Sequence, residues 1–130
     1  MNNCKRLLRF YFNAEELERA LGNLIITHAC RSADCAKGGE YYAQKILAVI
    51  GAKEQLSELW RYLNGAISEL KDEEVQTLKD YALLRCGIRK LNEAKQREIK
   101  RAVIKFSRHA RSLERYAEGV RLVGEYYCLM

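Results

Sequence analysis

The sequence predicts an all-α protein: a single helical domain over residues 1–130, built on a long antiparallel helical hairpin and a long amphipathic C-terminal helix. Proline, the residue that most often ends a helix, is absent, and only 8 glycines punctuate the chain. Apolar residues recur at alternating steps of three and four, which is the period of a helix with one buried face. Hydrophobic residues make up 48% of the 130 positions, which is enough for one packed core.

The first helical region covers residues 7–28. Asn13 followed three residues later by Glu16 is the pattern of a helix start, so the region is either one long helix or two helices with a break near Asn13. Residues 31–40, RSADCAKGGE, lose the helical period and contain two glycines, which predicts a loop. The apolar stripe of the first region consists of Leu7, Phe10, Ala14, Leu17, Leu21 and Leu24.

The second helical region covers residues 41–69, and Lys53 is the one polar interruption of its apolar stripe. Two helices of this kind joined by a short loop form an antiparallel hairpin. Gly51 and Gly65 each lower the helix propensity by about 1 kcal/mol, so a kink at either glycine is the alternative to a straight helix. The stripe consists of Ile46, Val49, Leu56, Trp60, Leu63, Ile67 and Leu70.

Two further helices complete the predicted bundle. Asp72 is the expected N-cap of a short helix that starts with acidic residues. Gly87, after Cys86, is expected to end this helix in the left-handed backbone conformation. Asn92 is the expected cap of the last helix, which continues to about Tyr127 and is roughly 50 Å long if unbroken.

The last helix carries the strongest functional signal, a basic stripe opposite its apolar face. Seven basic side chains fall within an arc of roughly 140° when each residue advances by 100°. Between Arg97 and Arg115 no acidic residue lies inside that arc. The opposite face holds Ile99, Ala102, Val103, Phe106, Ala110, Leu113, Ala117 and Val120, and the basic stripe consists of Arg97, Lys100, Arg101, Lys105, Arg108, Arg111 and Arg115.

The positive charge of the chain is concentrated around this stripe. The whole chain has a net charge of +6, whereas residues 85–115 hold eleven basic and three acidic residues, a net of +8. A basic stripe attracts a polyanion by releasing its condensed counterions, and arginine, which supplies five of the seven cations, suits phosphate oxygens. We therefore expect a DNA-binding protein in which the stripe contacts phosphates.

Other interpretations of the stripe stay open. Lysine and arginine are good helix formers, so a basic run is often only a solvated outer face. The stripe is also consistent with an RNA partner or with an acidic protein partner. The main alternative function is a helical interaction or oligomerisation module without a nucleic-acid role, whose long apolar stripes seek partner helices or a second copy of the chain.

The sequence contains no recognisable catalytic or cofactor motif. A glycine-rich phosphate loop, an HExxH motif and a nucleophile elbow are all missing, so we expect no enzyme, no cofactor and no small-molecule substrate. His28, Cys30 and Cys35 are zinc-type ligands, but a second ligand pair is lacking, and ordinary thiols are the alternative. Five cysteines without a secretion signal favour a cytoplasmic protein with reduced thiols, and no apolar run predicts a membrane span.

Within residues 42–113, one group of residues consists of Leu70, Val75, Leu78, Tyr81 and Gly87, and a second group consists of Ile88, Leu91, Ile99, Lys100, Arg101 and Leu113. With these residues the segment resembles the small sigma-factor-like transcription regulators of phage and mobile-element origin in bacteria. In that family an acidic capped helix leads through a glycine into a helix-turn-helix whose recognition helix is basic. The resemblance implies a DNA-binding regulator, but the family's Glu-Ile-Ala turn-entry motif is missing here, which leaves base-specific recognition open and phosphate contact expected.

Overall fold

The computed structural model describes residues 2–34, 39–110 and 113–127, and this part of the chain is helical without strands. The all-α prediction is therefore confirmed. A single 3₁₀ turn, η1 (Ile88–Lys90), lies between the fourth and fifth helices. The α-helices are α1 (Asn2–Phe12), α2 (Ala14–Asp34), α3 (Gly39–Ser68), α4 (Asp72–Leu83), α5 (Glu93–His109) and α6 (Leu113–Tyr127).

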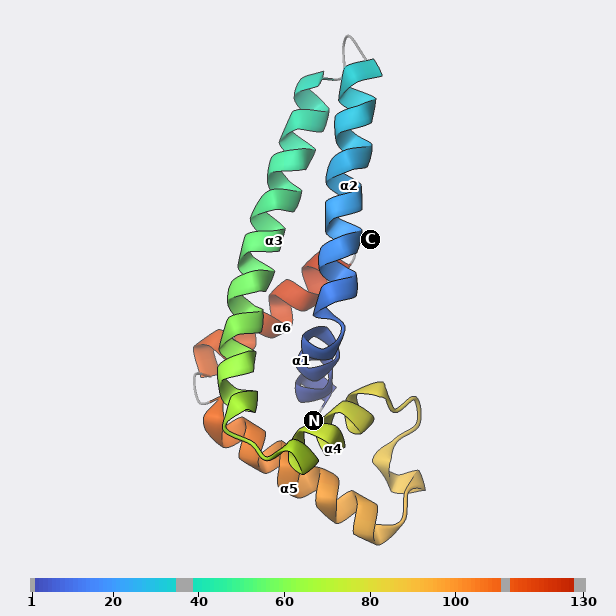
Figure 1. Cartoon of the computed structure of the whole chain (residues 1–130), viewed down its shortest axis with the longest axis vertical. Coiled ribbons are helices and arrows are strands. Elements are labelled where there is room, and N and C mark those ends of the chain that lie inside the picture. The colour runs from blue at the N-terminus through green and yellow to red at the C-terminus, as the bar shows by residue number, and fades with distance from the viewer. Residues whose placement is uncertain (1, 35–38, 111–112, 128–130) are drawn as a thin grey trace.

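Helices α2 and α3 form the predicted antiparallel hairpin, whose upper half projects from the rest of the molecule (Figure 1). The first helical region is two helices rather than one, because the chain turns at Asn13. The backbone N–H of Asn13 still donates to the carbonyl of Arg9, and Leu17 donates to Asn13, so little hydrogen bonding is lost at the bend. Helix α3 runs unbroken through Gly51 and Gly65.

The core lies at the base of the hairpin, where α1 packs against α3, α4 and α6. The side chains that are fully buried there come from helices that are far apart in the sequence, so their packing joins these helices in one core. Arg9 adds a hydrogen bond between α1 and α4. Its Nε donates to the carbonyl of Ala82 at 2.8 Å, near the end of α4 where carbonyls lack intrahelical partners. The largest fully buried side chains are Phe10, Phe106, Leu7, Leu8, Leu21, Leu63 and Leu78.

The ends of α4 differ from the prediction, whereas the start of α5 agrees with it. The N-cap of α4 is Lys71, one residue before Asp72, and its backbone N–H donates to Oε1 of Glu74 at 3.2 Å. The helix ends at Leu83, and Gly87 has a φ of −69°, so the predicted left-handed glycine stop is wrong. Asn92 caps α5 as predicted, since its Oδ1 accepts from the backbone N–H of Lys95 at 2.8 Å.

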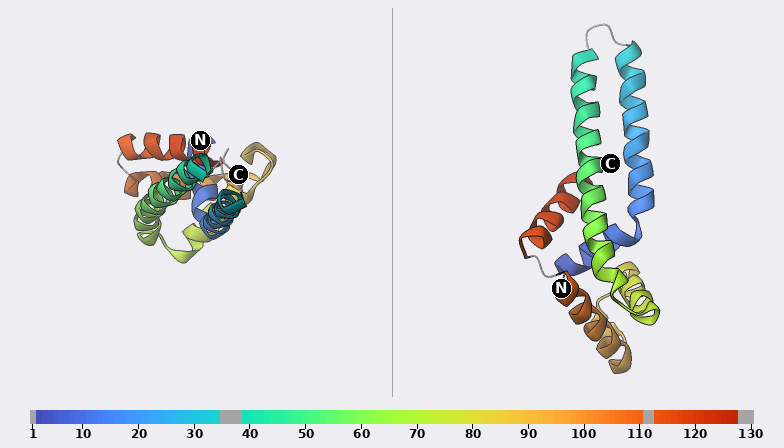
Figure 2. Two further views of the ribbon diagram at one scale, coloured as in Figure 1. Left: turned by 90° about the horizontal axis from the view of Figure 1, so that it is seen from above. Right: turned by 60° about the vertical axis from the view of Figure 1, so that its left-hand side comes forward.

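The prediction of one long C-terminal helix is wrong. Helix α5 ends at His109, the backbone of Ala110 leaves the helical region with a ψ of 59°, and α6 turns back along α3 and α1 (Figure 2). The turn buries Leu122 and Val123, which a straight rod would leave in water. Burial of these apolar side chains favours the reversed direction of α6.

Helix α6 crosses α3 at Gly119, which is buried. A β-carbon at this position would lie 2.7 Å from Cδ1 of Leu59 and 3.4 Å from Cδ2 of Leu7. Glycine therefore permits a helix–helix approach that any side chain would obstruct.

Among the described helices, none combines the length and the apolar character that are needed to cross a bilayer.

Candidate nucleic-acid interface

The buried face of α5 fixes the direction of its basic residues. Ile99, Ala102 and Phe106 are at most 4% exposed, and α5 packs on α4 and α3. At 100° per residue, the side chains of Arg97, Arg101 and Arg108 lie on the opposite side of the helix, within about 40° of one another. All three arginines are exposed. The outer face of α5 is therefore cationic, as predicted.

This face lies at the end of the molecule that is remote from the hairpin tip (Figure 1). Lys100 is exposed at one edge of it, and Ile104 is 53% exposed between the arginines. We call Arg97, Lys100, Arg101 and Arg108 the outer basic face of α5. Its members come from a single helix whose inner side is anchored in the core, so their spacing is fixed by the fold.

The other three residues of the predicted stripe are not part of this face. Lys105 points toward α4, and its Nζ lies 2.7 Å from Oε2 of Glu74. Arg115 belongs to α6, and its guanidinium carbon lies 5.6 Å from the ring centroid of Tyr62 on α3. Arg111 lies outside the described residues. The predicted stripe of seven is thus divided by the break between α5 and α6.

The Lys105–Glu74 pair lowers the pKa of Glu74 and offsets one positive charge of α5. The hydrogen bond from Lys105, together with one from the backbone N–H of Lys71, holds the pKa of Glu74 below its ordinary value. Glu74 is therefore ionised at neutral pH and opposes the charge of Lys105. The cationic potential at this end of the molecule comes mainly from the outer basic face and the segment before α5.

The connection between α4 and α5 extends the basic surface beyond the residues of the predicted stripe. Four further cations in this connection and in the first turn of α5 are exposed. From residue 85 to residue 109 the chain holds nine Lys or Arg and two Glu, a net charge of +7. The run of basic residues before α5 was the sequence signal that pointed to them. They are Arg85, Arg89, Lys90 and Lys95.

Helices α4 and α5 do not form a tight helix-turn-helix. Residues 84–92 separate them and contain only the 3₁₀ turn η1, whereas a helix-turn-helix uses a turn of 3–4 residues. Residues 88–90 form only this 3₁₀ turn and residues 93–98 already belong to α5, so no separate helix forms between α4 and α5. The geometry therefore favours contact with phosphates over reading of base edges.

The histidine and cysteine cluster does not converge on one point in the described part of the chain. His28 and Cys30 are two residues apart on α2, so their side chains leave opposite sides of the helix. The His28 ring lies 6.0 Å from that of Tyr42, while Cys30 is exposed. Cys35 lies outside the described residues, and no group of three metal-ligating side chains occurs among those described.

Comparisons with protein-family models, with curated proteins and with solved structures find no match for this chain. The geometry of the outer basic face is therefore the main guide to function.

Proposed function

We propose that the protein is a non-enzymatic nucleic-acid-binding protein that holds the phosphate backbone of duplex DNA on the outer basic face of α5. The observation that carries this proposal is the position of Arg97, Arg101 and Arg108. All three are exposed on one side of α5, which we call its ridge, opposite the buried face of the helix. Guanidinium groups in this position reach phosphate oxygens without any change in the core.

The dimensions of α5 fit a duplex. Arg97 and Arg108 are eleven residues apart, or about 16 Å along the helix axis. The major groove of B-DNA is roughly 12 Å wide and admits an α-helix, so the two ends of the ridge can contact the phosphate strands on either side of the groove. Ile104 between them would then face the groove floor, where an apolar side chain can meet a thymine methyl group.

We further propose a role in transcription, because residues 42–113 resemble sigma-like regulators. Phosphate contacts position a protein on DNA without reading its sequence, so a regulator built in this way requires a second protein or a second site for specificity.

Fluorescence anisotropy with a labelled duplex tests the proposal. With four phosphate contacts, we expect affinity to fall by roughly 100-fold between 50 and 200 mM salt. The double variant Arg101→Glu with Arg108→Glu should weaken binding by about tenfold or more at low salt, with unchanged helical circular dichroism.

The matched control changes the same number of charges on another helix. Arg19 and Arg31 are exposed on α2, so Arg19→Glu with Arg31→Glu lowers the net charge equally but leaves α5 intact. We expect this control to bind much more tightly than the α5 variant. Equal loss in the two variants would mean that net charge alone drives binding, and unchanged affinity in the α5 variant would show that α5 is not the contact.

A further inference from the structure

The chain between α4 and α5, residues 84–92, is held in place at both ends, and we call it the connection. At its start, Nη2 of Arg9 donates to the carbonyl of Leu84 at 3.4 Å. At its end, Nε2 of Gln96 on α5 donates to the carbonyl of Leu91 at 2.8 Å. Figure 1 shows the connection beside α4, at the end of the molecule that is remote from the hairpin tip. These bonds give it a defined position next to the first turns of α5.

The 3₁₀ turn η1 directs two cations of the connection outward. The backbone N–H of Leu91 donates to the carbonyl of Ile88 at 3.0 Å and closes the turn. Side chains three residues apart eclipse one another in a 3₁₀-helix, so Ile88 and Leu91 lie on one side of it. Both are partly buried and pack against the core. Arg89 and Lys90 therefore lie on the other sides of the turn, and both are exposed.

The positive charge of the connection is not offset within the described part of the chain. Residues 84–92 contain three cations and no acidic residue, a net charge of +3. Neither Arg89 nor Lys90 forms an ion pair with a described residue. The next acidic residue along the chain is Glu93 in the first turn of α5, where a carboxylate also interacts with the positive end of the helix dipole. Both cations are therefore available to an anionic partner.

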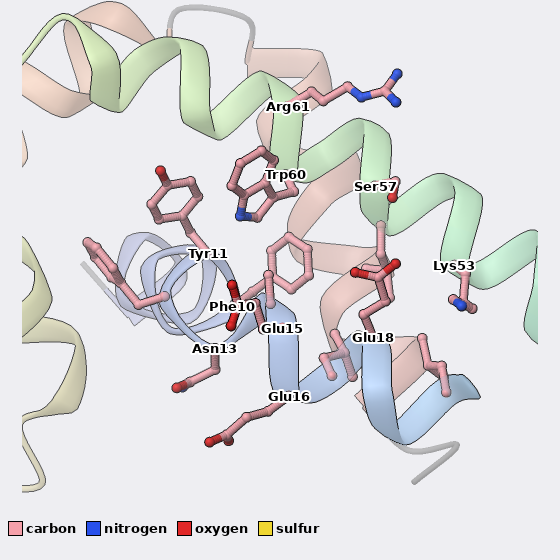
Figure 3. Close-up of a pocket in the computed structure, with 15 residues that line it drawn as sticks. Phe10, Tyr11, Asn13, Glu15, Glu16, Glu18, Lys53, Ser57, Trp60 and Arg61 are labelled. Atoms are coloured by element: carbon pink, nitrogen blue, oxygen red, sulfur yellow. The ribbon is translucent and has the colours of Figure 1, made fainter. Parts of the chain in front are cut away.

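The groove where α1 bends into α2 has a different charge pattern (Figure 3). Its volume is about 660 Å³, and the rings of Tyr11 and Trp60, stacked with centroids 5.5 Å apart, form part of its wall. Three carboxylates and two cations line this groove, so its charge does not favour a polyanion. The connection, in contrast, gathers cations without carboxylates. The charged residues of the groove are Glu15, Glu16, Glu18, Lys53 and Arg61.

The connection precedes the end of α5 that holds Arg97. From Lys90 to Glu93 the chain spans at most about 10.5 Å, and from Glu93 to Arg97 the helix rises by about 6 Å. The Cα atoms of Lys90 and Arg97 are therefore at most roughly 17 Å apart. The hydrogen bond between Gln96 and Leu91 keeps the connection close to this end of the helix.

This position lies next to a minor groove in the proposed complex. There, α5 crosses the major groove from the phosphate strand at Arg97 to the strand at Arg108. Beyond the strand at Arg97 the neighbouring minor groove begins, which is about 6 Å wide. The short separation from Arg97 therefore lets Arg89 and Lys90 reach past this strand.

We propose that the connection contacts this minor groove, with Arg89 and Lys90 directed into it. The inference rests on the proposed function, since it places α5 in the neighbouring major groove. Cations enter a narrow, A·T-rich minor groove most readily, because the negative potential is enhanced there. In a G·C pair, the 2-amino group of guanine projects into the minor groove instead. The connection thus gives the protein a preference for A·T-rich duplexes, which the phosphate contacts of α5 lack.

Fluorescence anisotropy with three duplexes of equal length tests this contact. The central base pairs are A·T in the first duplex, G·C in the second and I·C in the third. Inosine is guanosine without the 2-amino group, so an I·C pair resembles G·C in the major groove and A·T in the minor groove. We expect the wild type to bind the A·T and I·C duplexes about fivefold or more tightly than the G·C duplex.

The double variant Arg89→Ala with Lys90→Ala should bind the I·C and G·C duplexes equally. Its helical circular dichroism should stay unchanged, because both side chains are exposed. The matched control, Arg31→Ala with Lys45→Ala, also removes one exposed arginine and one exposed lysine, but from the hairpin near its tip. We expect this control to keep the wild-type preference for the I·C duplex.

Two results would overturn the minor-groove contact and leave the proposed function in place. One is equal affinity of the wild type for the I·C and G·C duplexes, and the other is a preference that persists without Arg89 and Lys90. An equal loss of preference in the hairpin control would also overturn it. Arg101→Glu with Arg108→Glu tests the proposed function separately, since this variant should bind all three duplexes more weakly. Absence of duplex binding by the wild type would overturn both proposals.

Discussion

The Nζ atom of Lys105 lies 2.7 Å from Oε2 of Glu74, and this pair joins α5 to α4. The hydrogen bond from Lys105 is the largest cause of the lowered pKa of Glu74. A carboxyl whose pKa is lowered by folding stabilises the native state above its unfolded pKa and loses that contribution as the pH falls through its folded pKa. The pair thus links the orientation of α5 to acid stability.

Glu74→Gln should reduce stability at neutral pH and flatten the acid dependence of unfolding. Glutamine cannot ionise, so the variant lacks the contribution of the ion pair at every pH. We expect its Tm to lie below that of the wild type at pH 7 and to converge on it below the ordinary carboxyl pKa of 4.5. Thermal unfolding between pH 3 and 7 measures this. A constant difference over the whole range would show that the pair does not act through ionisation.

The two sides of α5 should respond differently to truncation. Phe106 is 0% exposed, so Phe106→Ala should reduce the free energy of unfolding by about 3–5 kcal/mol through lost burial and a cavity. Ile104 is 53% exposed, and Ile104→Ala should change it by less than about 0.5 kcal/mol. Urea denaturation of both variants checks this. Similar losses in the two would contradict the assignment of the outer face.

The crossing of α6 over α3 can be tested at Gly119. Alanine there must displace the side chain of Leu59, at a cost of about 1–3 kcal/mol, which offsets the gain in helix propensity. The control is Gly65→Ala in α3, where no atom lies within 4 Å of the added carbon and only the gain of about 0.5–1 kcal/mol remains. Denaturant unfolding should rank Gly65→Ala as the more stable. The reverse order would place α6 elsewhere.

Arg115 should matter less for DNA binding than the predicted stripe implies. It lies on α6 against the ring of Tyr62, beyond the break that ends α5. In anisotropy titrations at low salt, we therefore expect Arg115→Glu to weaken duplex binding less than Arg101→Glu, although both change the charge equally. An equal loss would indicate that α6 shares the DNA contact.

The features that the sequence predicted well depend on local interactions. The cap at Asn92 is a hydrogen bond across three residues, and the hairpin follows from apolar periods over two long segments. The buried side of α5 agrees with the predicted stripe up to Ala110. Rotation by 100° per residue was therefore enough to place the arginines of α5 on the outer face.

The features that were missed depend on contacts between distant segments. The apolar period continues across residues 110–113, so no local pattern reveals the reversal of the chain, which depends on tertiary contacts such as that of Gly119 with Leu59. After this break Leu122 and Val123 are buried instead of Ala117, because the new helix has a different phase. The Lys105–Glu74 pair likewise joins residues that no local pattern connects.

The salt dependence of duplex binding tests the central claim most directly. For contact through Arg97, Lys100, Arg101 and Arg108, the slope of log affinity against log salt should be about −3.6, and each replacement of one of these residues by alanine should reduce it by about 0.9. Alanine at Arg19, which is exposed on α2, should leave the slope unchanged. No binding at 50 mM salt, or a slope that stays the same when all four residues of the outer basic face are alanine, would contradict the account.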